Sequence, residues 1–459
     1  MEHRPLLHYE PPSGWLNDPN GLVFHDGVWH LCYQHHPDSL DWGPMHWGHA
    51  VSTDLVTWRD LPIALYPDAN GTVYSGSAVI DRQGTAGFGR GAMVAVYTQF
   101  TPSTQVQSIA GSVDGGRTWR VHPGNPVLRQ PDGVVDFRDP KVSWFGGDGD
   151  GHWVMVLAVG DGARFFASHD LVTWEPTGAF APERGRPHGV WETPDLFALP
   201  LGEPPGQRWV LSVGALEHAP AGGSGTRYWT GDFDGATFTA DTAARWADHG
   251  ADFYAAQSWS DVPGGRRVWI AWMSNWMYAS HVPAAAARGQ LTVPRQVGLE
   301  PDGADGWVLV QRPVDEIARH LSSPVAPGAG VPLRTGAAWV RLWSRAGASG
   351  RAAVNIAAAD AHAHVVHDPT AGTVTLDRTG AAGIGHGFAG VHTAAVPPGG
   401  IDLDVVIDRS SIEVFADGGR ACLTDLVVGL SGDGPVTVAV EGEAVAHADL
   451  RHVEGADAG

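Results

Sequence analysis

The chain has 459 residues, of which 61 are glycine and 33 are proline, and its formal net charge is −21. So much glycine and proline favours tight turns and short strands over a helical bundle or a coiled coil. The negative charge disfavours nucleic acid and anionic membranes as partners. Cys32 and Cys422 are too few and too far apart in sequence for a disulfide framework or a zinc site.

The beginning of the sequence carries no recognisable export or membrane signal. Residues 1–4 are polar and lead directly into a motif described below, and no apolar run approaches the roughly 18 residues that a membrane helix needs. We therefore expect a cytoplasmic protein, or a secreted one if the sequence is a trimmed mature form.

A short pattern recurs four times in the first 240 residues, each copy having an aspartate a few residues before an aromatic residue. The aromatic ends are Trp58, Trp119, Trp174 and Phe238, spaced 61, 55 and 64 residues apart. Repeats of this length are typical of β-propeller blades. We expect each aspartate to hold a hairpin turn through its backbone and each aromatic ring to fill the gap between blades.

Strand-like runs rich in Val, Trp, Tyr and Phe lie at the spacing that blades require. They cover residues 28–34, 93–100, 152–160, 208–216 and 267–276. About 300 residues at about 60 per blade predict five four-stranded blades.

The character of the sequence changes after residue 305. The best helical periodicity in the chain lies at 314–321, beyond which tryptophan becomes sparse and short alternating strands follow closely. The prediction is an all-β protein with a five-bladed β-propeller over 1–305, a linker with a short helix over 306–325 and a C-terminal β-sandwich domain over 326–459.

Three carboxylates stand in unusual local settings. Asp18 lies in WLNDPNG (15–21), Asp139 in DFRDPK (136–141) and Glu192 in WETPD (191–195). Each alone has a structural explanation, as a sharp turn or an ion pair. Their spacings of 121 and 53 residues, however, place them two blades and then one blade onward, and equivalent positions on successive blades converge on the propeller axis. Two carboxylates that flank an anomeric carbon form a glycosidase site.

Aromatic and neutral polar residues near these motifs suit a sugar ligand, which is bound by ring faces and hydroxyl-directed hydrogen bonds. They lie at 33–34, 42–49, 74–77 and 271–276. Most of the 20 tryptophans are nevertheless expected to pack between blades, and the 23 histidines show no helical zinc spacing.

Several of these motifs together resemble glycoside hydrolase family 32, which contains invertases, exo-inulinases and levanases. The resemblance rests on WLNDPNG (15–21), WGHA (47–50), YSGS (74–77), FRDPK (137–141), WETPD (191–195) and DRSSIEVF (408–415). It covers essentially the whole chain and implies a five-bladed propeller followed by a β-sandwich. Residues 257–259 and 272–276 look most like the exo-inulinase and levanase branch.

The resemblance implies roles for individual residues. Asp18 would be the nucleophile, Glu192 the general acid/base, and Asp139, with Arg138 beside it, the carboxylate that holds fructose hydroxyls and stabilises the transition state. The walls of the fructose subsite would be Asn17, Gln34, Trp42, Ser75 and Trp272, with Asp252 and Tyr254 as further candidates. Fructose would leave with retained configuration through a fructosyl-enzyme, and neither a metal nor a cofactor would be needed.

One residue departs from the family pattern. Thr193 follows the acid/base Glu192, where the family usually has cysteine. A hydroxyl that donates to ionised Glu192 would lower its pKa, and one that accepts from the protonated form would raise it. The pH optimum therefore stays open.

Other functions remain in view. A fructosyltransferase acting on levan or inulin would use the same double-displacement site, with a sugar hydroxyl in place of water. An inverting arabinan-type hydrolase is disfavoured by the sandwich domain and the WLNDPNG motif, and an inactive fructan-binding module by the retention of all three carboxylates. The expected substrate is a fructan, a fructo-oligosaccharide or sucrose. Linkage preference and oligomeric state are not evident from the sequence.

Overall fold

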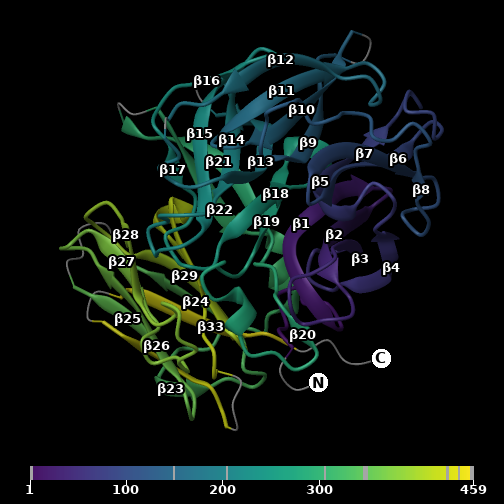
Figure 1. The fold of residues 1–459 in the computed structure, drawn as a ribbon. Helices are drawn as coiled ribbons and strands as arrows, with labels where there is room; N and C mark the ends of the chain where they lie inside the picture. The colour runs from purple at the N-terminus through teal and green to yellow at the C-terminus, as the bar shows by residue number, and fades with distance from the viewer. Residues whose placement is uncertain are drawn as a thin grey trace.

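The computed structural model describes residues 4–147, 150–183, 185–202, 205–303, 306–344, 350–430, 434–442 and 445–454. These residues form two parts built of β-sheets, a propeller from purple to green and a sandwich from green to yellow (Figure 1). The predicted all-β class, with a five-bladed propeller before a β-sandwich, is confirmed. No helix in the described parts of the chain is long and apolar enough to cross a bilayer.

The propeller consists of five antiparallel sheets whose strands follow one another in chain order. Blade 1 contains β1 (Gly14–His25), β2 (Val28–His36), β3 (His46–Ser52) and β4 (Arg59–Leu65), with β20 (Ala287–Arg288) added beside β1. Blade 2 contains β5 (Thr72–Asp81), β6 (Ala92–Thr101), β7 (Thr104–Ser112) and β8 (Arg120–Val121). Blade 3 contains β9 (Phe137–Phe145), β10 (His152–Val159), β11 (Gly162–Ser168) and β12 (Glu175–Phe180). Blade 4 contains β13 (Trp191–Leu201), β14 (Gly206–Ala215), β15 (Gly225–Phe233) and β16 (Phe238–Ala240), with β17 (Arg245–Trp246) paired to β15. Blade 5 contains β18 (Tyr254–Ser258), β19 (Arg267–Trp272), β21 (Arg295–Pro301) and β22 (Trp307–Pro313).

The first strand of every blade lies at the centre. β1, β5, β9, β13 and β18 contact one another in that order, and β18 contacts β1 to close the ring. Residues at the same level of these five strands therefore face a common axis.

The four repeated turns lie at equivalent places, between the third and fourth strands of blades 1 to 4. In each of them the aspartate holds the turn as predicted; Asp54 Oδ1, for example, accepts hydrogen bonds from the backbone N–H groups of Val56 and Thr57. The aromatic ring at the end packs against the preceding blade, as Trp58 does by stacking on Trp259 at 6.4 Å between ring centroids. These rings fill the gaps between blades.

The predicted end of the propeller at residue 305 is wrong. β22 (Trp307–Pro313) pairs with β21 and completes blade 5, so the propeller extends to Pro313. Residues 307–313, which the prediction placed in the linker, are the fourth strand of this blade. The helix expected at 314–321 is the 3-10 helix η4 (Asp315–His320).

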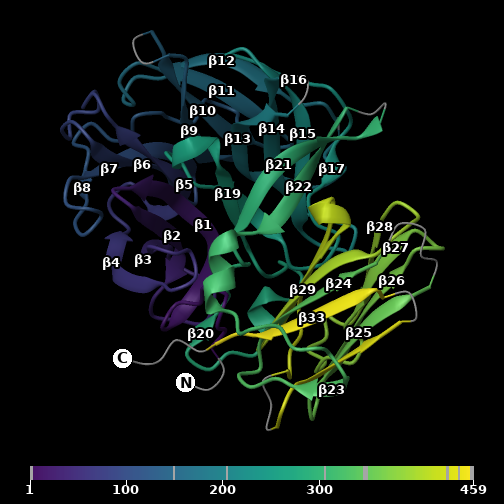
Figure 2. The same ribbon diagram turned by 180° about the vertical axis from the view of Figure 1, so that it is seen from behind.

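The sandwich consists of a six-stranded and a five-stranded antiparallel sheet. The six-stranded sheet is ordered β23 (Ala329–Pro332), β32 (Thr437–Glu441), β25 (Ala352–Ala357), β26 (His362–Asp368), β27 (Thr373–Asp377) and β28 (Val391–Ala395). The five-stranded sheet is ordered β31 (Ala421–Leu426), β30 (Ser411–Ala416), β29 (Asp402–Asp408), β24 (Ala338–Trp343) and β33 (His447–His452). Their facing apolar side chains form a separate core. The five-stranded sheet lies nearer the propeller in both views (Figures 1 and 2).

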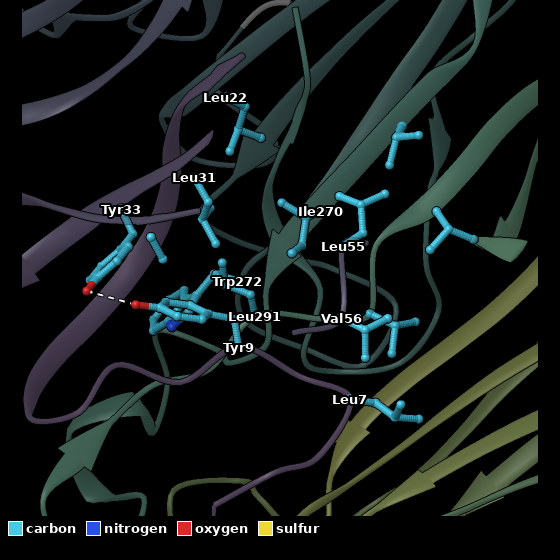
Figure 3. Packing of buried hydrophobic residues seen from close by; sticks show 14 of the residues in the cluster. Leu7, Tyr9, Leu22, Leu31, Tyr33, Leu55, Val56, Ile270, Trp272 and Leu291 are labelled. Atoms are coloured by element: carbon cyan, nitrogen blue, oxygen red, sulfur yellow. Dashed lines mark hydrogen bonds between the residues drawn. The ribbon is translucent and has the colours of Figure 1, made fainter. Parts of the chain in front are cut away.

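A shared core joins the two domains. Leu7, Tyr9, Leu55 and Val56 of the propeller pack in one cluster with Phe415 and other side chains of the five-stranded sheet. Figure 3 shows part of this cluster, with a 3.0 Å hydrogen bond from the Tyr9 hydroxyl to that of Tyr33.

The DRSSIEVF motif also serves the domain interface. His8 lies fully buried between Asp408 and Glu413, with its ring nitrogens 2.8 and 2.7 Å from their carboxylates. Hydrogen bonds to these two carboxylates overcome burial and raise the pKa of His8 to about 9. Glu413 also accepts from the buried Arg295 of β21. The motif therefore ties the N-terminal segment and blade 5 to the sandwich.

Lys141, the single lysine of the chain, lies within the ring of inner strands. Its Nζ donates to the backbone oxygen of Ser258 at 2.6 Å and to Asp195 Oδ2 at 3.1 Å, and its side chain is 4% exposed. These bonds join the inner strands of blades 3, 4 and 5.

Candidate active site

Each of the five inner strands contributes at least one polar side chain to the same end of the propeller axis. These residues are Asp18 on β1, Ser75 on β5, Asp139 on β9, Glu192 on β13 and Tyr254 on β18. Hydrogen bonds or mutual charge effects connect all five. The convergence that the blade spacing predicted is therefore present.

The inner strands are irregular at this level. The pairing register of β1 with β2 shifts between Leu16 and Pro19, and β13 and β18 shift just after Glu192 and Tyr254. Bulges of this kind turn side chains away from the regular pleat, and they are common beside active sites. Consecutive residues of β1 and β9, Asn17 with Asp18 and Arg138 with Asp139, line the same pocket at this level.

Three residues at these irregularities have positive φ. The angle is 65° at Asp139, 46° at Thr193 and 55° at Ala255. A β-branched residue such as Thr193 rarely adopts this conformation, because its side chain crowds the backbone. Backbone strain of this kind persists only where surrounding contacts impose it, and it concentrates at functional sites.

Asp18 is held in a buried position. Its Oδ2 accepts a 2.7 Å hydrogen bond from the Ser75 hydroxyl, while Oδ1 is buried without a protein partner. Burial and the nearby charge of Glu192 raise the pKa of Asp18 to about 6, against the opposing effect of the Ser75 hydrogen bond. The Ser75 hydrogen bond thus fixes the direction of the carboxylate.

Glu192 is oriented through both of its oxygens. Oε1 accepts from Nη2 of Arg138 at 2.9 Å and from its Nε at 3.2 Å, and Oε2 accepts from the Tyr254 hydroxyl at 2.6 Å. Burial, followed by the charge of Glu192, raises the pKa of Tyr254 well above its usual value, so this hydroxyl keeps its proton and acts as the donor. The Glu192 side chain is 20% exposed, which leaves it open to solvent or to a leaving group.

Asp139 completes the group of carboxylates. Burial raises its pKa, the charge of Arg138 opposes this effect, and the charges of Glu192 and Asp18 add to it. With one guanidinium among three carboxyl groups, full ionisation would leave excess negative charge in a partly buried space. Such a cluster titrates as a unit and retains a proton more readily than an isolated carboxylate does.

These groups line one pocket of about 390 Å³. Of the predicted site residues, the pocket is lined by Asn17, Asp18, Gln34, Trp42, Ser75, Arg138, Asp139 and Glu192. Its volume lies near the lower end of the range for small-molecule sites. The pocket is therefore of a size that suits a short saccharide.

Trp272 does not line this pocket. It is 0% exposed and packs against Trp15 and Trp276, with ring centroids 6.1 and 4.8 Å away. Figure 3 shows it within the buried cluster beside Leu291 and Tyr9. The wall expected of Trp272 is formed by Trp276, which follows in the loop after β19. Sequence alone could not tell which of the two rings is outermost.

Asp252 does not line the pocket either. It is fully buried and pairs with Arg378 of the sandwich at 2.6 Å. Tyr254, the other further candidate, contacts the site through Glu192.

Several lining residues were not singled out from the sequence. Besides Trp276, the pocket contains Tyr74, Phe100, Gln105 and Leu216. Tyr74 and Trp276 lie inside motifs that drew attention for other residues, whereas the remaining three lie in segments without a distinctive local pattern. Tyr74 stacks on Phe100 with centroids 4.6 Å apart, forming an aromatic rim on the side of blade 2.

The described residues contain no group of three or more His, Cys, Asp or Glu side chains arranged to hold a metal ion.

Comparison with known proteins gives matches over nearly the whole chain. The family model described as glycosyl hydrolases family 32 N-terminal domain matches residues 8–313, and that described as glycosyl hydrolases family 32 C terminal matches residues 313–451. A levanase of Bacillus subtilis (strain 168) is 41% identical over 454 residues, which cover 93% of this chain and 66% of the levanase. An extracellular exo-inulinase of Aspergillus awamori is 33% identical over 481 residues, covering 92% of this chain and 89% of that protein.

Solved structures give the same result. The crystal structure of the exo-inulinase from Aspergillus awamori superposes with a TM-score of 0.89 at 31% identity and covers 99% of both chains. A β-fructofuranosidase from Schwanniomyces occidentalis, complexed with fructosyl-erythritol, has a TM-score of 0.88 at 28% identity and covers 98% of both chains.

Proposed function

The chain belongs to glycoside hydrolase family 32, a family of β-fructofuranosidases and fructan hydrolases, and on that premise we propose that it releases terminal fructose from fructans or fructo-oligosaccharides with retained configuration. The observation that carries this proposal is the convergence of Asp18, Asp139 and Glu192 in one pocket, with Asp18 anchored by Ser75 and Glu192 oriented by Arg138 and Tyr254.

In the first step, Asp18 attacks the anomeric carbon of the terminal fructosyl unit. The carboxylate of Asp18 is the nucleophile, and the Ser75 hydrogen bond on Oδ2 fixes its direction. Glu192 donates a proton to the departing glycosidic oxygen. Its partial exposure supports this role, since the leaving group must approach from the open side of the pocket.

Asp139 and Arg138 act on the fructose ring and on the acid/base residue. Asp139 accepts hydrogen bonds from ring hydroxyls, and these strengthen as positive charge develops in the oxocarbenium-like transition state. Arg138 holds the Glu192 carboxylate that forms after proton donation, with bonds to Oε1 from both Nη2 and Nε.

In the second step, water takes the place of the leaving group. Glu192, now ionised, accepts a proton from this water, which attacks the fructosyl-enzyme and regenerates Asp18. Two displacements on the same carbon restore the original configuration, so fructose is released as the β anomer.

The lining of the pocket and the structures of related enzymes support a chain end as the substrate. The aromatic rings of Trp42, Tyr74 and Trp276 suit the apolar faces of sugars, and the volume of about 390 Å³ suits a short saccharide. Structures of the Schwanniomyces occidentalis enzyme are described as complexes with fructose and with fructosylnystose.

Product analysis tests this proposal. The enzyme is incubated with levan, inulin, nystose and sucrose, and early products are separated by anion-exchange chromatography, with Asp18→Asn as the inactive control. Free fructose as the first product from long chains supports exo-hydrolysis. Short oligosaccharides from levan or inulin would instead indicate endo-cleavage, oligosaccharides longer than the nystose supplied would indicate a transferase, and no reaction would reject the proposal.

Stereochemistry is tested with methanol as an added acceptor. A retaining double displacement transfers fructose to methanol as methyl β-fructofuranoside, which does not mutarotate and is identified by NMR. Formation of the α-fructofuranoside would reject Asp18 as a nucleophile.

A further inference from the structure

A buried arginine of the sandwich domain lies directly behind the active-site loops of the propeller. Arg378 follows β27 and is 0% exposed. Its Nη1 donates to Asp252 Oδ2 at 2.6 Å, and its Nη2 donates to the Tyr278 hydroxyl at 2.9 Å. The Tyr278 hydroxyl in turn donates to Asp252 Oδ1 at 2.6 Å. Three hydrogen bonds thus join the Arg378 guanidinium of the sandwich domain to Asp252 and Tyr278 of the propeller, and these two residues to each other.

The surroundings hold this arginine in one place. Its guanidinium lies over the ring of Phe388, 4.1 Å from the centroid, and Nη1 also donates to the backbone oxygen of Leu426 at 3.0 Å. Asp425 lies 3.8 Å away and provides a second negative charge. A planar, bidentate cation cannot be replaced in such a site by lysine without losing one of its contacts.

The first element that Arg378 fixes carries the donor to Glu192. Asp252 lies two residues before Tyr254, the first residue of β18, and its own backbone is tied to the sandwich because its N–H donates to the Thr424 oxygen at 2.9 Å. Tyr254 donates to Glu192 Oε2 at 2.6 Å. A shift of Asp252 would therefore move this hydroxyl.

The second element carries a wall of the pocket. Tyr278 lies two residues after Trp276, and its N–H donates to the oxygen of Asn275 at 3.1 Å. Asn275 is 1% exposed and donates through Nδ2 to the backbone oxygens of Ser224 and Ala251. The loop that presents Trp276 is consequently fastened to Tyr278 at one end and to blade 4 through Asn275.

We propose that Arg378 is a positioning residue for the active site. By holding Asp252 and Tyr278 together, it sets the Tyr254 hydroxyl against Glu192 and Trp276 against the substrate, so the sandwich domain takes part in the reaction. The inference goes beyond the proposed function and rests on the roles given there to Glu192 and the pocket wall.

The main test compares two conservative variants, Arg378→Lys and Arg295→Lys. Arg295 is the matched control because it is also 0% exposed at the domain interface and also bonded to carboxylates, Glu413 and Asp248. Its other hydrogen bonds go to Gln311 and Thr424, so it bonds directly to neither Asp252 nor Tyr278. Both variants lose a bidentate contact and are expected to lower the melting temperature. Initial rates are measured on inulin and on an activated aryl fructoside over a range of pH.

Arg378→Lys is expected to lower kcat/KM on inulin by about 10-fold or more, since small displacements of positioning groups have effects of this size. The loss should be several-fold smaller on the aryl fructoside, whose leaving group needs little help from Glu192. KM should rise on both substrates through Trp276, and the pH profile of kcat/KM should shift. Arg295→Lys should keep the wild-type pH profile, KM and substrate ratio.

A milder pair keeps the test decisive if Arg378→Lys does not fold. Tyr278→Phe removes only the hydroxyl between Arg378 and Asp252, and Tyr228→Phe is its control, a buried tyrosine whose hydroxyl accepts from the Leu309 N–H at 3.2 Å away from the pocket. Only Tyr278→Phe should change the substrate ratio and KM.

Two results would overturn the proposal. Equal losses on inulin and the aryl fructoside in the Arg378→Lys or Tyr278→Phe enzyme, with an unchanged pH profile, would mean that Arg378 serves stability alone. Wild-type kinetics in both variants would have the same meaning. A wild-type enzyme that releases no fructose would contradict the proposed function itself, which is a separate outcome visible before any variant is made.

Discussion

The backbone N–H of Thr193 donates a 2.9 Å hydrogen bond to Oδ2 of Asp139. Because Thr193 directly follows Glu192, the chain at one carboxylate of the site holds a second carboxylate in place. Both residues have positive φ, and the turn of the chain at Thr193 is what directs this N–H toward blade 3. Glu192 and Asp139 are thereby coupled through the backbone as well as through Arg138. A change of conformation at Thr193 would move both carboxylates at once.

The Thr193 side chain allows a test of stability that leaves this backbone contact in place. Its hydroxyl is buried without a hydrogen-bond partner in the protein. Thr193→Val keeps the shape and removes the unpaired hydroxyl, so the free energy of unfolding should rise by about 1 kcal/mol. Thr98→Val is the control: the Thr98 hydroxyl donates to Gln107 and accepts from the Asp139 N–H, so its loss should lower stability by about 1–3 kcal/mol. Urea unfolding of both variants measures the difference, and destabilisation by Thr193→Val would contradict the expectation.

The acid limb of the pH–rate profile should depend on Ser75. Asp18 must be ionised to attack, and its pKa of about 6 means that kcat/KM falls as the pH drops through that value. The Ser75 hydrogen bond lowers this pKa, so Ser75→Ala should raise it and move the acid limb to higher pH. Ser77→Ala, on the same strand, removes a hydroxyl that donates to the Pro140 backbone oxygen and should leave the limb in place. A shift of the Ser75→Ala profile to lower pH would contradict the assignment of this limb to Asp18.

Asp18 should lower the stability of the folded protein at neutral pH. Its pKa is about 6 in the folded chain against 3.8 for the unperturbed group, so the folded state binds this proton more tightly. The penalty is absent below about pH 4 and fully present above about pH 6. Asp18→Asn should therefore raise the free energy of unfolding by about 2–3 kcal/mol at pH 8 and by almost nothing at pH 4. Denaturant unfolding at the two pH values checks this, and an equal gain at both would show that ionisation of Asp18 is not its source.

The roles of Glu192 and Asp139 can be distinguished by comparing substrates with different leaving groups. Glu192→Ala removes the proton donor but leaves the nucleophile, so the rate on inulin should fall by about 10²–10⁴, with a much smaller loss of fructosylation on an activated aryl fructoside. Azide should rescue this variant, because an anionic nucleophile needs no general base. Asp139→Ala should lose similar factors on both substrates, since its proposed partner is the fructose ring. Equal losses on both substrates in Glu192→Ala would mean that the acid/base role lies elsewhere.

Much of this arrangement could be predicted because blade spacing is recorded in the sequence. The numbers of residues that separate Asp18, Asp139 and Glu192 follow the same period as the aromatic residues of the repeated turns. Their convergence could therefore be predicted without knowing any contact between remote segments. The last strand of the fifth blade was missed, because residues 307–313 were placed in the linker and only their pairing with β21 shows that they belong to the propeller.

What could not be predicted depends on contacts between segments far apart in sequence. Asp252 lies beside a pocket residue in the chain, yet its partner is Arg378, 126 positions later, and no local pattern announces a buried ion pair. Trp272 and Trp276 are both tryptophans of one motif, and only the path of the loop after β19 decides which ring is covered.

The buried position of Lys141 allows unfolding of the protein to be followed by chemical modification of this one side chain. Because the single lysine is buried among the inner strands and bonded to Asp195 and Ser258, lysine-directed reagents have no exposed lysine side chain to modify in the folded chain. Acylation of Lys141, followed by mass spectrometry, would therefore measure how often the ring of blades opens. Substrate analogues that bind only the folded protein would slow this acylation, and no engineered label would be required.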